Sequence, residues 1–543
     1  MRFDLTCDER LPPLAWLLRH ERGEDAARVV AGQSVIAADD AFWEGVNPCF
    51  REPARTPQHH FPLCTGCVRR GDEIVAFTPG HIFDRLFMIR QDGRLLLSNS
   101  LPFLLKATGT RLHPRDLLYH WRFGVIQAHR QTAPLECGRL EFFHNTNVAI
   151  SREHRVRCEP KPPSPDFNSF AEYKANMDAL LAEIAAALCG QQIQYEPVST
   201  ISSGYDSAAA AVLAKAIGAT RTLTISDSRC GEAGDDSGEP IARRLGMSAS
   251  VRTRNDHHSA GLEAERLFYL YGLPEDIIFH AFADELRRTL LFTGHKGDTM
   301  WDINGRPVGS WSLDPGGATM QCFRLRMDFV HFPPAFLGWA RHRKVIALSQ
   351  SDEMQPWSVG TSYDRPIARR IVEEAGVPRD WFGVKKRAVS AMYGLDSKSY
   401  VSETELGVSR EFAELLARHR RRWTSPGLEL GMTLGNAVHG AMKRVNRALS
   451  GRDAGDERRS VRPGRRSLKS RLTILMGYLG NAHRAFWIPF SDLSFSPQVA
   501  NELLAADYPD AEELWAVSPR SAALEEQPTR SADRDGKVTP SNA

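Results

Sequence analysis

The chain has 543 residues, and its 69 Lys and Arg against 66 Asp and Glu give a formal net charge of +3. At about 150 residues per domain, this length predicts several units rather than one small module. A hydrophobic content of 42% is enough for a sizeable core. The near-neutral balance excludes an overall positive field that would attract nucleic acid, so we expect no nucleic-acid partner.

No stretch of about eighteen uninterrupted apolar residues occurs, so we expect no membrane span and no membrane partner. The first residues, Met1 to Asp4, lack the apolar stretch of a signal peptide. The nine cysteines are scattered along the chain. Together these features favour a protein of the reducing cytoplasm.

Residues 1–158 are predicted to be mainly β. An Asp92-Gly93 turn between residues 86–90 and 94–98 predicts a hairpin. Further elements are expected as a strand at 142–150 and short helices at 101–106 and 114–121. Prolines 160, 162, 163 and 165 exclude helix and remove ladder donors. Residues 159–168 are therefore predicted to be a proline-rich linker.

The pattern changes after the linker. Apolar residues recur at helical spacing along residues 170–188, which predicts an amphipathic helix; they are Tyr173, Met177, Leu180, Ile184 and Leu188. Strands at 197–201, 222–226, 248–252 and 289–293 then alternate with helices at 208–217 and 240–245. This alternation favours an α/β fold with a parallel sheet and flanking helices. Residues 325–450 are expected to be mainly helical.

The turn at residues 202–207 holds the strongest signal. A strand ends and a helix begins there, and the turn is built of small residues. The helix start offers unpaired N–H groups and a positive dipole end, which suit a phosphate or pyrophosphate. Asp206 can hold Mg²⁺ on such an anion. The alternative is an ordinary N-cap formed by Ser203 or Asp206. Neither a Walker loop nor a nucleophile elbow fits this sequence.

The turn Ser202-Ser203-Gly204-Tyr205-Asp206-Ser207 resembles the Ser-Gly-Gly-x-Asp-Ser pyrophosphate loop of the ATP pyrophosphatases, the PP-loop superfamily. Within it, the chain is most similar to asparagine synthetase and its relatives, which include β-lactam synthetase and lasso-peptide cyclases. The resemblance implies that these six residues bind ATP and its pyrophosphate, with Mg²⁺ as cofactor. Ser203 departs from the family, which has glycine there.

Two further stretches follow in the family's order. The strand at 222–226 precedes Asp235-Asp236-Ser237, and the resemblance implies that Ile225 lies near the adenine. Residues 291–299 resemble the family's Leu-x-Ser-Gly-Glu-Gly-Gly-Asp-Glu, with matches at Thr293, Gly294, Gly297 and Asp298. Asp298 is thus expected to share Mg²⁺ with Asp206; the alternative is a surface turn.

The same stretch departs from the family at His295, Lys296 and Thr299. The family's glutamate at the position of His295 works near the acceptor amine or the intermediate. Histidine can act there as a base near neutral pH, or it can be purely structural. Because it cannot supply the same negative charge, the departure indicates a different acceptor or substrate.

A lysine is expected to complete the site. Residues 324–331 and 363–370 resemble the next two stretches of the family, and residues 384–388 fall where the family has its catalytic lysine. Lys386 fits the spacing best and Lys385 is second. Such a cation would stabilise the charged acyl transition state by about 3 kcal/mol. The alternative is a solvated basic loop.

The first unit resembles the family's glutaminase domain, of the Ntn-hydrolase type, in its second half. Glutamine-dependent members carry a cysteine directly after the initiator methionine, where this chain has Arg2, and Cys7 is displaced. We therefore expect no glutaminase activity, and an amine supplied by free ammonia, a separate protein or the substrate.

Other cysteine chemistry has weaker support. A zinc site at His59, His60, Cys64 and Cys67 would be compressed compared with common sites. A thiolation role for Cys230 stays open. Residues 458–471, rich in Lys and Arg, are expected to be a solvated loop rather than a surface for acidic partners.

The expected enzyme is an ATP-dependent, AMP-forming carbon–nitrogen ligase. It would adenylate a small-molecule or peptide carboxylate, release pyrophosphate and pass the acyl group to an amine. One alternative is an amide- or lactam-forming enzyme of a natural-product, peptide or polysaccharide cluster. Another is a non-catalytic ATP-binding pseudoenzyme, motivated by Ser203, Lys296 and Thr299. The sequence leaves open whether the protein forms a homodimer.

The expected organisation has five parts. They are a degenerate glutamine amidotransferase-like domain (1–158), the linker (159–168), an asparagine-synthase-like catalytic domain (169–450), a C-terminal extension (451–516) and a disordered tail (517–543).

Overall fold

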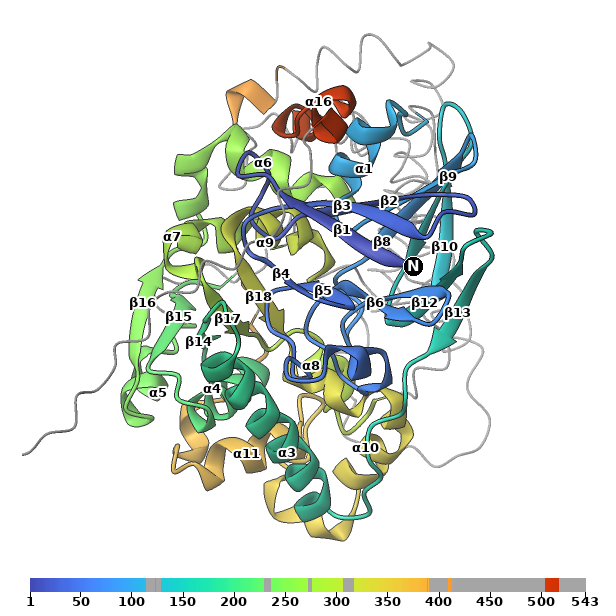
Figure 1. Ribbon diagram of the computed structural model, residues 1–543. Helices are drawn as coiled ribbons and strands as arrows, with labels where there is room; N and C mark the ends of the chain where they lie inside the picture. Colours follow the sequence, from blue (N-terminus) through green and yellow to red (C-terminus); the bar gives the residue numbers. More distant parts are fainter. Residues whose placement is uncertain are drawn as a thin grey trace, which may run out of the picture.

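The computed structural model describes residues 1–113, 123, 128–228, 236–271, 276–305, 317–387, 389, 409–412, 414 and 503–516. The chain is mixed α/β, with a mainly β N-terminal region and a separate parallel sheet (Figure 1). The predicted helix at 114–121, Asp235, Cys230, the basic stretch 458–471 and the tail from 517 lie outside the described residues.

The N-terminal region contains two sheets. The seven-stranded sheet has the order β1-β3-β2-β9-β8-β11-β10. Its strands are β1 (Arg2–Cys7), β2 (Trp16–Glu21), β3 (Ala26–Ala31), β8 (Leu86–Gln91), β9 (Arg94–Ser98), β10 (Arg130–Pro134) and β11 (Arg139–Phe143). The six-stranded sheet has the order β13-β12-β7-β6-β5-β4. Its strands are β4 (Val35–Ala38), β5 (Ala41–Glu44), β6 (Gly66–Arg70), β7 (Glu73–Phe77), β12 (Thr146–Ser151) and β13 (Val156–Pro160).

The predicted hairpin is confirmed. Gln91 pairs with Arg94 across an antiparallel ladder, and both turn residues have positive φ, 51° at Asp92 and 76° at Gly93. Such angles define the tight turns that suit the twist of paired strands. The single strand predicted at 142–150 is wrong. Asn145, at φ 41°, turns the chain there, so that β11 and β12 belong to different sheets.

The five-stranded sheet is parallel throughout, in the order β16-β15-β14-β17-β18. Its strands are β14 (Glu196–Thr200), β15 (Arg221–Ile225), β16 (Ser248–Arg252), β17 (Thr289–Phe292) and β18 (Phe329–Phe332). Four of them correspond to predicted strands. The fifth, β18, falls where helix was expected, because a four-residue buried run has no strand periodicity to reveal it.

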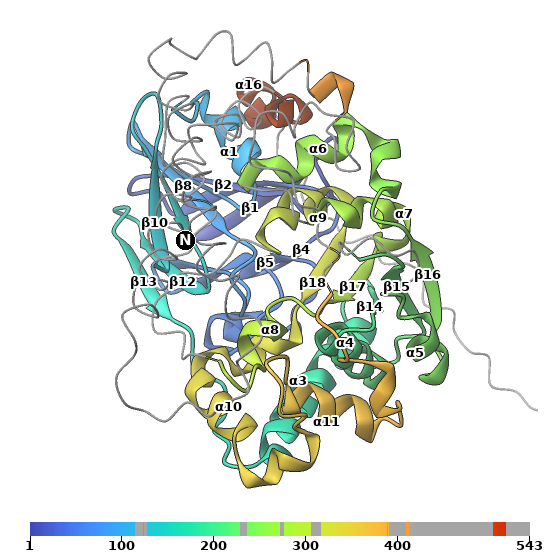
Figure 2. The ribbon, with the colours of Figure 1, turned by 180° about the vertical axis from the view of Figure 1, so that it is seen from behind.

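Helices cover both faces of this sheet. Leu290 and Phe292 of β17 face one core with α3 (Phe170–Gly190), α4 (Tyr205–Ala216), α5 (Glu239–Arg244), α10 (His342–Ser349) and α11 (Pro366–Glu374). Leu291 faces the opposite core with α6 (Leu262–Phe268), α7 (Ala283–Leu286) and α9 (Gln321–Met327). Figure 2 shows α3, α4 and α11 together on one side. The five predicted face residues of the helix at 170–188 are all buried in α3.

The described part of the chain contains further helices. They are η1 (Pro53–Gln58), α1 (Leu101–Thr108), η2 (Asp256–Ala260), η3 (Tyr269–Tyr271), η4 (Ile277–Phe282), α8 (Gly297–Met300), η5 (Ala318–Met320), η6 (Pro334–Arg341), η7 (Asp352–Trp357), η8 (Arg379–Trp381), η10 (Ala505–Asp507) and α16 (Ala511–Ala516), where η marks a 3₁₀-helix. Residues 161–169 join β13 to α3 without helix or strand. No helix in the described ranges combines the length and apolarity needed to cross a membrane.

Buried charges join the N-terminal sheets to the parallel-sheet part. The guanidinium of Arg324, in α9, donates to both carboxylate oxygens of Glu44 at 2.8 and 2.9 Å and to Asp84 at 3.1 Å. All three side chains are almost fully buried. Because an unpaired buried charge is costly, this triad fixes how the two parts meet.

Part of the C-terminal stretch also packs on the fold. The hydroxyl of Tyr508 lies 2.7 Å from that of Ser100, and its ring stacks on Phe103 with centroids 4.8 Å apart. Asp507 accepts two hydrogen bonds from Arg266 of α6. Both views place α16 beside α1 and α6 (Figures 1 and 2). Residues 503–516 therefore bridge the N-terminal part and α6.

Candidate functional site

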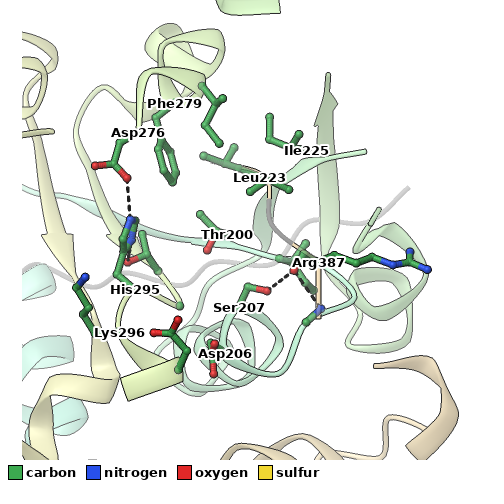
Figure 3. A pocket seen from close by; sticks show the side chains of 18 of the residues that line it. Thr200, Asp206, Ser207, Leu223, Ile225, Asp276, Phe279, His295, Lys296 and Arg387 are labelled. Carbon is green, nitrogen blue, oxygen red and sulfur yellow. Dashed lines mark hydrogen bonds and ion pairs between the residues drawn. The ribbon is translucent and has the colours of Figure 1, made fainter. Parts of the chain in front are cut away.

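A cavity of about 440 Å³ opens at the carboxyl ends of β14, β15 and β17. The chain moves from β14 toward one sheet edge through β15 and β16, whereas β17 lies on the other side of β14. Open parallel sheets bind ligands at such a switch point, outside the carboxyl ends of their strands. The cavity is thus where the topology alone places a ligand site. Figure 3 shows its side chains.

One wall is the loop that leads from β14 into α4. Gly204 is the N-cap of α4, and no side chain caps this helix end. The Oγ atoms of Ser202 and Ser207 lie 2.7 Å apart, and the Gly204 N–H donates to Ser202 Oγ at 3.1 Å. The alternative of a cap formed by Ser203 or Asp206 is therefore wrong. The helix begins at Tyr205, three residues earlier than predicted, so Asp206 sits in its first turn.

Charged side chains of both signs line the cavity, and two of the carboxylates bond an arginine or a lysine. Arg365 donates from Nη1 to Oδ2 of Asp206, and Lys386 donates from Nζ to Oδ2 of Asp298 at 3.3 Å. Oδ1 of Asp206 is buried and has no hydrogen-bond partner among the residues that the structure describes. Burial raises the pKa of Asp206 to about 6, although the positive charge of Arg365 acts to lower it. The pKa of Asp298 is lowered although burial acts to raise it, because Arg365 and Lys386 lie nearby.

Two glycines let the β17 loop approach α4 closely. A Cβ atom at Gly294 would lie 2.6 Å from the Ser207 nitrogen, and one at Gly297 would lie 2.3 Å from Cγ of Asp206. Real Cβ atoms do not come this close to other atoms, so only glycine fits at either position. These glycines bring Asp298, the residue after Gly297, to the start of α4.

His295 lies in the cavity with both ring nitrogens engaged. Its Nε2 is 2.9 Å from Oδ1 of Asp276, and its Nδ1 is 2.9 Å from the hydroxyl of Thr293 (Figure 3). Asp276 is buried, and its other oxygen accepts from Thr319 Oγ1 at 2.5 Å and from the Gly317 N–H at 2.8 Å. This geometry favours the structural alternative for His295, because neither nitrogen is free to meet a substrate.

The far end of the cavity is apolar. Ile225 and Leu223 come from the end of β15, and Ile278, Phe279 and Phe282 come from η4. Aliphatic and aromatic side chains of this kind suit a flat heterocycle. The cavity therefore has an apolar end and a charged end.

Most predicted site residues come together here. Those that line the cavity are Ser202, Gly204, Asp206, Ser207, Ile225, Gly294, His295, Asp298 and Lys386. Ser203 instead donates from Oγ to Asp236 at 2.6 Å, and the hydroxyl of Tyr205 accepts from Arg369 at 2.6 Å behind the loop. Lys385 is not among the lining residues.

Sequence reasoning missed two charged residues of the site. Arg365 lies within the stretch 363–370, whose resemblance to a family helix was noted without assigning this residue a role. Asp276 belongs to none of the motifs that the sequence offers. Only the fold brings Asp276 beside His295.

The donor set fits Mg²⁺ better than zinc. Mg²⁺ commonly takes one or two carboxylates together with phosphate oxygens, and Asp206 offers a buried oxygen that no described residue bonds. Across the described ranges, no group of three or more His, Cys, Asp or Glu is arranged to hold a metal. Cys64 and Cys67 are buried in two different hydrophobic clusters, and His59 bonds Glu183 at 2.9 Å. These observations leave the zinc hypothesis without support.

Cys7, the cysteine nearest the chain start, does not resemble an activated nucleophile. It ends β1, the outer strand of the seven-stranded sheet. Partial burial raises the pKa of its thiol, and the charges of Glu9 and Asp8 raise it further. A catalytic thiol needs a lowered pKa.

No known family model matches this sequence, and a search of curated proteins finds no relative of it.

Proposed function

We propose that the chain is a divergent member of the ATP pyrophosphatase superfamily and an ATP-dependent, AMP-forming carbon–nitrogen ligase. One observation carries the proposal. At the switch point of a parallel sheet, a helix start without a side-chain cap lies beside two carboxylates that each bond a cation. This arrangement suits a polyphosphate and its metal.

Each part of the cavity then has a role. The apolar end at Ile225 and Phe279 would hold the adenine, and the helix start with Ser202 and Ser207 would hold the β- and γ-phosphates. Asp206 and Asp298 would hold Mg²⁺, which would make pyrophosphate a better leaving group. The substrate carboxylate attacks the α-phosphate to give an acyl-adenylate and pyrophosphate, and an amine then displaces AMP.

Lys386 would act in both steps. Its ammonium lies beside Asp298 at the charged end, half exposed and able to reach a ligand. A cation there stabilises the charge that develops on the phosphate and acyl oxygens. The amine itself would come from ammonia, a second protein or the substrate.

A pyrophosphate-release assay with panels of carboxylates and amines tests this function, with Asp206→Ala as its control. We expect release to require ATP, a divalent metal and a carboxylate. Turnover that survives Asp206→Ala would contradict the metal assignment.

A second candidate is a nucleotide-binding protein without catalysis. The pairing of Arg365 with Asp206, where a metal is required, favours it. Binding of ATP without turnover across a broad panel would support this candidate against the ligase.

A further inference from the structure

Arg365 and Lys386, which bond Asp206 and Asp298, differ in how deeply they are buried. The side chain of Arg365 is only 3% exposed, whereas that of Lys386 is 59% exposed. Lys386 thus bonds Asp298 as an exposed surface group, while Arg365 is part of the packed wall. The pair formed by Arg365 and Asp206 is therefore a built feature of the cavity.

The local structure fixes Arg365. It precedes Pro366 at the start of α11, and its backbone, at φ −137° and ψ 76°, lies outside the α region, which is disfavoured for a residue before proline. Asp364 ties the preceding loop by accepting from the Val359 and Gly360 N–H groups at 2.9 and 3.0 Å. The guanidinium lies over the Tyr363 ring, 5.0 Å from its centroid. It is thereby held against the start of α4.

The pair is incompletely satisfied on both sides. The pair has a single hydrogen bond, in which Nη1 of Arg365 donates to Oδ2 of Asp206. Oδ1 of Asp206 and Nε of Arg365 are buried, and neither has a partner in the described structure. Leaving buried polar groups without partners costs free energy. Both groups gain if the carboxylate meets a metal ion and the guanidinium meets phosphate oxygens, which match its forked N–H groups.

We propose that Arg365 makes metal binding conditional on the nucleotide. Without a nucleotide, the guanidinium neutralises Asp206 and opposes a free divalent ion. The polyphosphate offers Arg365 a new anionic partner, and Asp206 is then released to the metal that arrives with it. This inference rests on the proposed nucleotide-binding function and adds a regulatory role for Arg365 in that site.

Thermodynamic linkage relates the affinity for the metal to the affinity for the nucleotide. If the nucleotide raises the affinity for the metal by some factor, the metal raises the affinity for the nucleotide by the same factor. Typical couplings of this kind are about 5- to 150-fold. Removing Arg365 removes the competitor of the metal, so the metal alone should bind more tightly and the coupling factor should shrink.

Mn²⁺ titration of the full chain measures this directly, with free Mn²⁺ followed by electron paramagnetic resonance. The titration is run with and without the non-hydrolysable analogue α,β-methylene-ATP. We expect wild type to bind Mn²⁺ weakly alone and about tenfold or more tightly with the analogue. Arg365→Gln should bind Mn²⁺ alone more tightly and lose most of the coupling.

Arg369→Gln is the matched control. Arg369 lies one turn further along α11 and is also buried, but it bonds Tyr205 at 2.6 Å and Glu373 at 3.0 Å and does not line the cavity. The Arg369→Gln variant should keep the wild-type coupling between Mn²⁺ and the analogue. Thermal unfolding checks that each variant folds. If Arg365→Gln does not fold, Arg365→Lys decides, and its coupling should fall at least about threefold because lysine lacks the fork.

Two results would overturn the inference. One is wild-type protein that binds Mn²⁺ equally well with and without the analogue. The other is a folded Arg365 variant with unchanged coupling. If the analogue binds normally in either case, only this inference fails. If wild type binds no analogue even at saturating Mn²⁺, the proposed function fails as well.

Discussion

Lys386 donates a hydrogen bond from Nζ to Oδ2 of Asp298 across 3.3 Å, although 88 residues separate them in the chain. This contact joins the segment after η8 to the first turn of α8, and both residues line the cavity. It gives the site a lysine that can move from a carboxylate to a ligand.

The first prediction distinguishes the two neighbouring lysines. Lys386→Gln should lower the rate of pyrophosphate release by about a hundredfold or more, since it removes a cation from the reacting charge. Lys385→Gln should retain most of the rate, because Lys385 is not a lining residue. Steady-state kinetics on both variants checks this, and equal losses would argue against the choice of Lys386.

The second prediction concerns the close approach at Gly297. Gly297→Ala should abolish metal–nucleotide binding, because its Cβ would meet Asp206 Cγ at 2.3 Å. Gly204→Ala is a milder comparison, since φ there is −83° and the nearest atom to its Cβ would be Ser202 Oγ, at 3.2 Å. Nucleotide binding by calorimetry should fail in the first variant and persist, weakened, in the second. Normal binding by Gly297→Ala would contradict the packing described for this loop.

The third prediction is a pH dependence of stability. The pKa of Asp276 is lowered from 3.8: burial acts to raise it, but the hydrogen bond and charge of His295, together with the hydrogen bonds from Thr319 and Gly317, lower it. A lowered carboxyl pKa stabilises the fold at neutral pH, and this contribution is lost as pH falls below about 4. Asp276→Asn should therefore cost about 1–3 kcal/mol at pH 7.

Thermal unfolding of wild type and Asp276→Asn between pH 7 and pH 3 measures the difference. The gap in Tm should narrow on acidification. A gap that widens would show that the carboxylate is not the stabilising form.

The fourth prediction tests the C-terminal contact. Tyr508→Phe keeps the ring on Phe103 and loses the hydrogen bond to Ser100, so it should cost about 1 kcal/mol of unfolding free energy. Tyr508→Ala also leaves a cavity and should cost about 3–5 kcal/mol. Denaturant unfolding compares the two variants. Wild-type stability in Tyr508→Ala would mean that residues 503–516 do not hold this position in solution.

The fifth prediction is that glutamine does not serve as the nitrogen donor. Cys7 has a raised thiol pKa and ends an outer strand, so it has none of the activation that a nucleophile needs. The purified protein incubated with glutamine should release no glutamate. Release that disappears in Cys7→Ala would reverse this conclusion.

The sequence predicted the frame of the site because its signals are local. Neighbouring residues alone predict the strand, turn and helix at 198–217 and the glycine-containing turn at 294–297. The structure has the corresponding elements. The helix start at Tyr205 was placed too late, because small turn residues resemble a loop when read alone. Strand β18 was missed because a short buried run carries no alternation.

The charge partners could not be read from the sequence. Arg365 and Asp206 are 159 residues apart, and Asp276 and His295 meet through two loops. Pairing at such separations depends on how α11, η4 and β17 pack around the sheet. The same packing decides that His295 uses both nitrogens within the protein, which its sequence position could not indicate.

The most direct test of the proposed chemistry is the identity of the nucleotide product. ATP is incubated with the full chain, Mg²⁺ and panels of carboxylates and amines, and the products are separated by chromatography. We expect cleavage between the α- and β-phosphates, which gives AMP and pyrophosphate in equal amounts, and we expect this reaction to require a carboxylate. Formation of ADP and phosphate, or ATP binding without any turnover across the panel, would contradict the account.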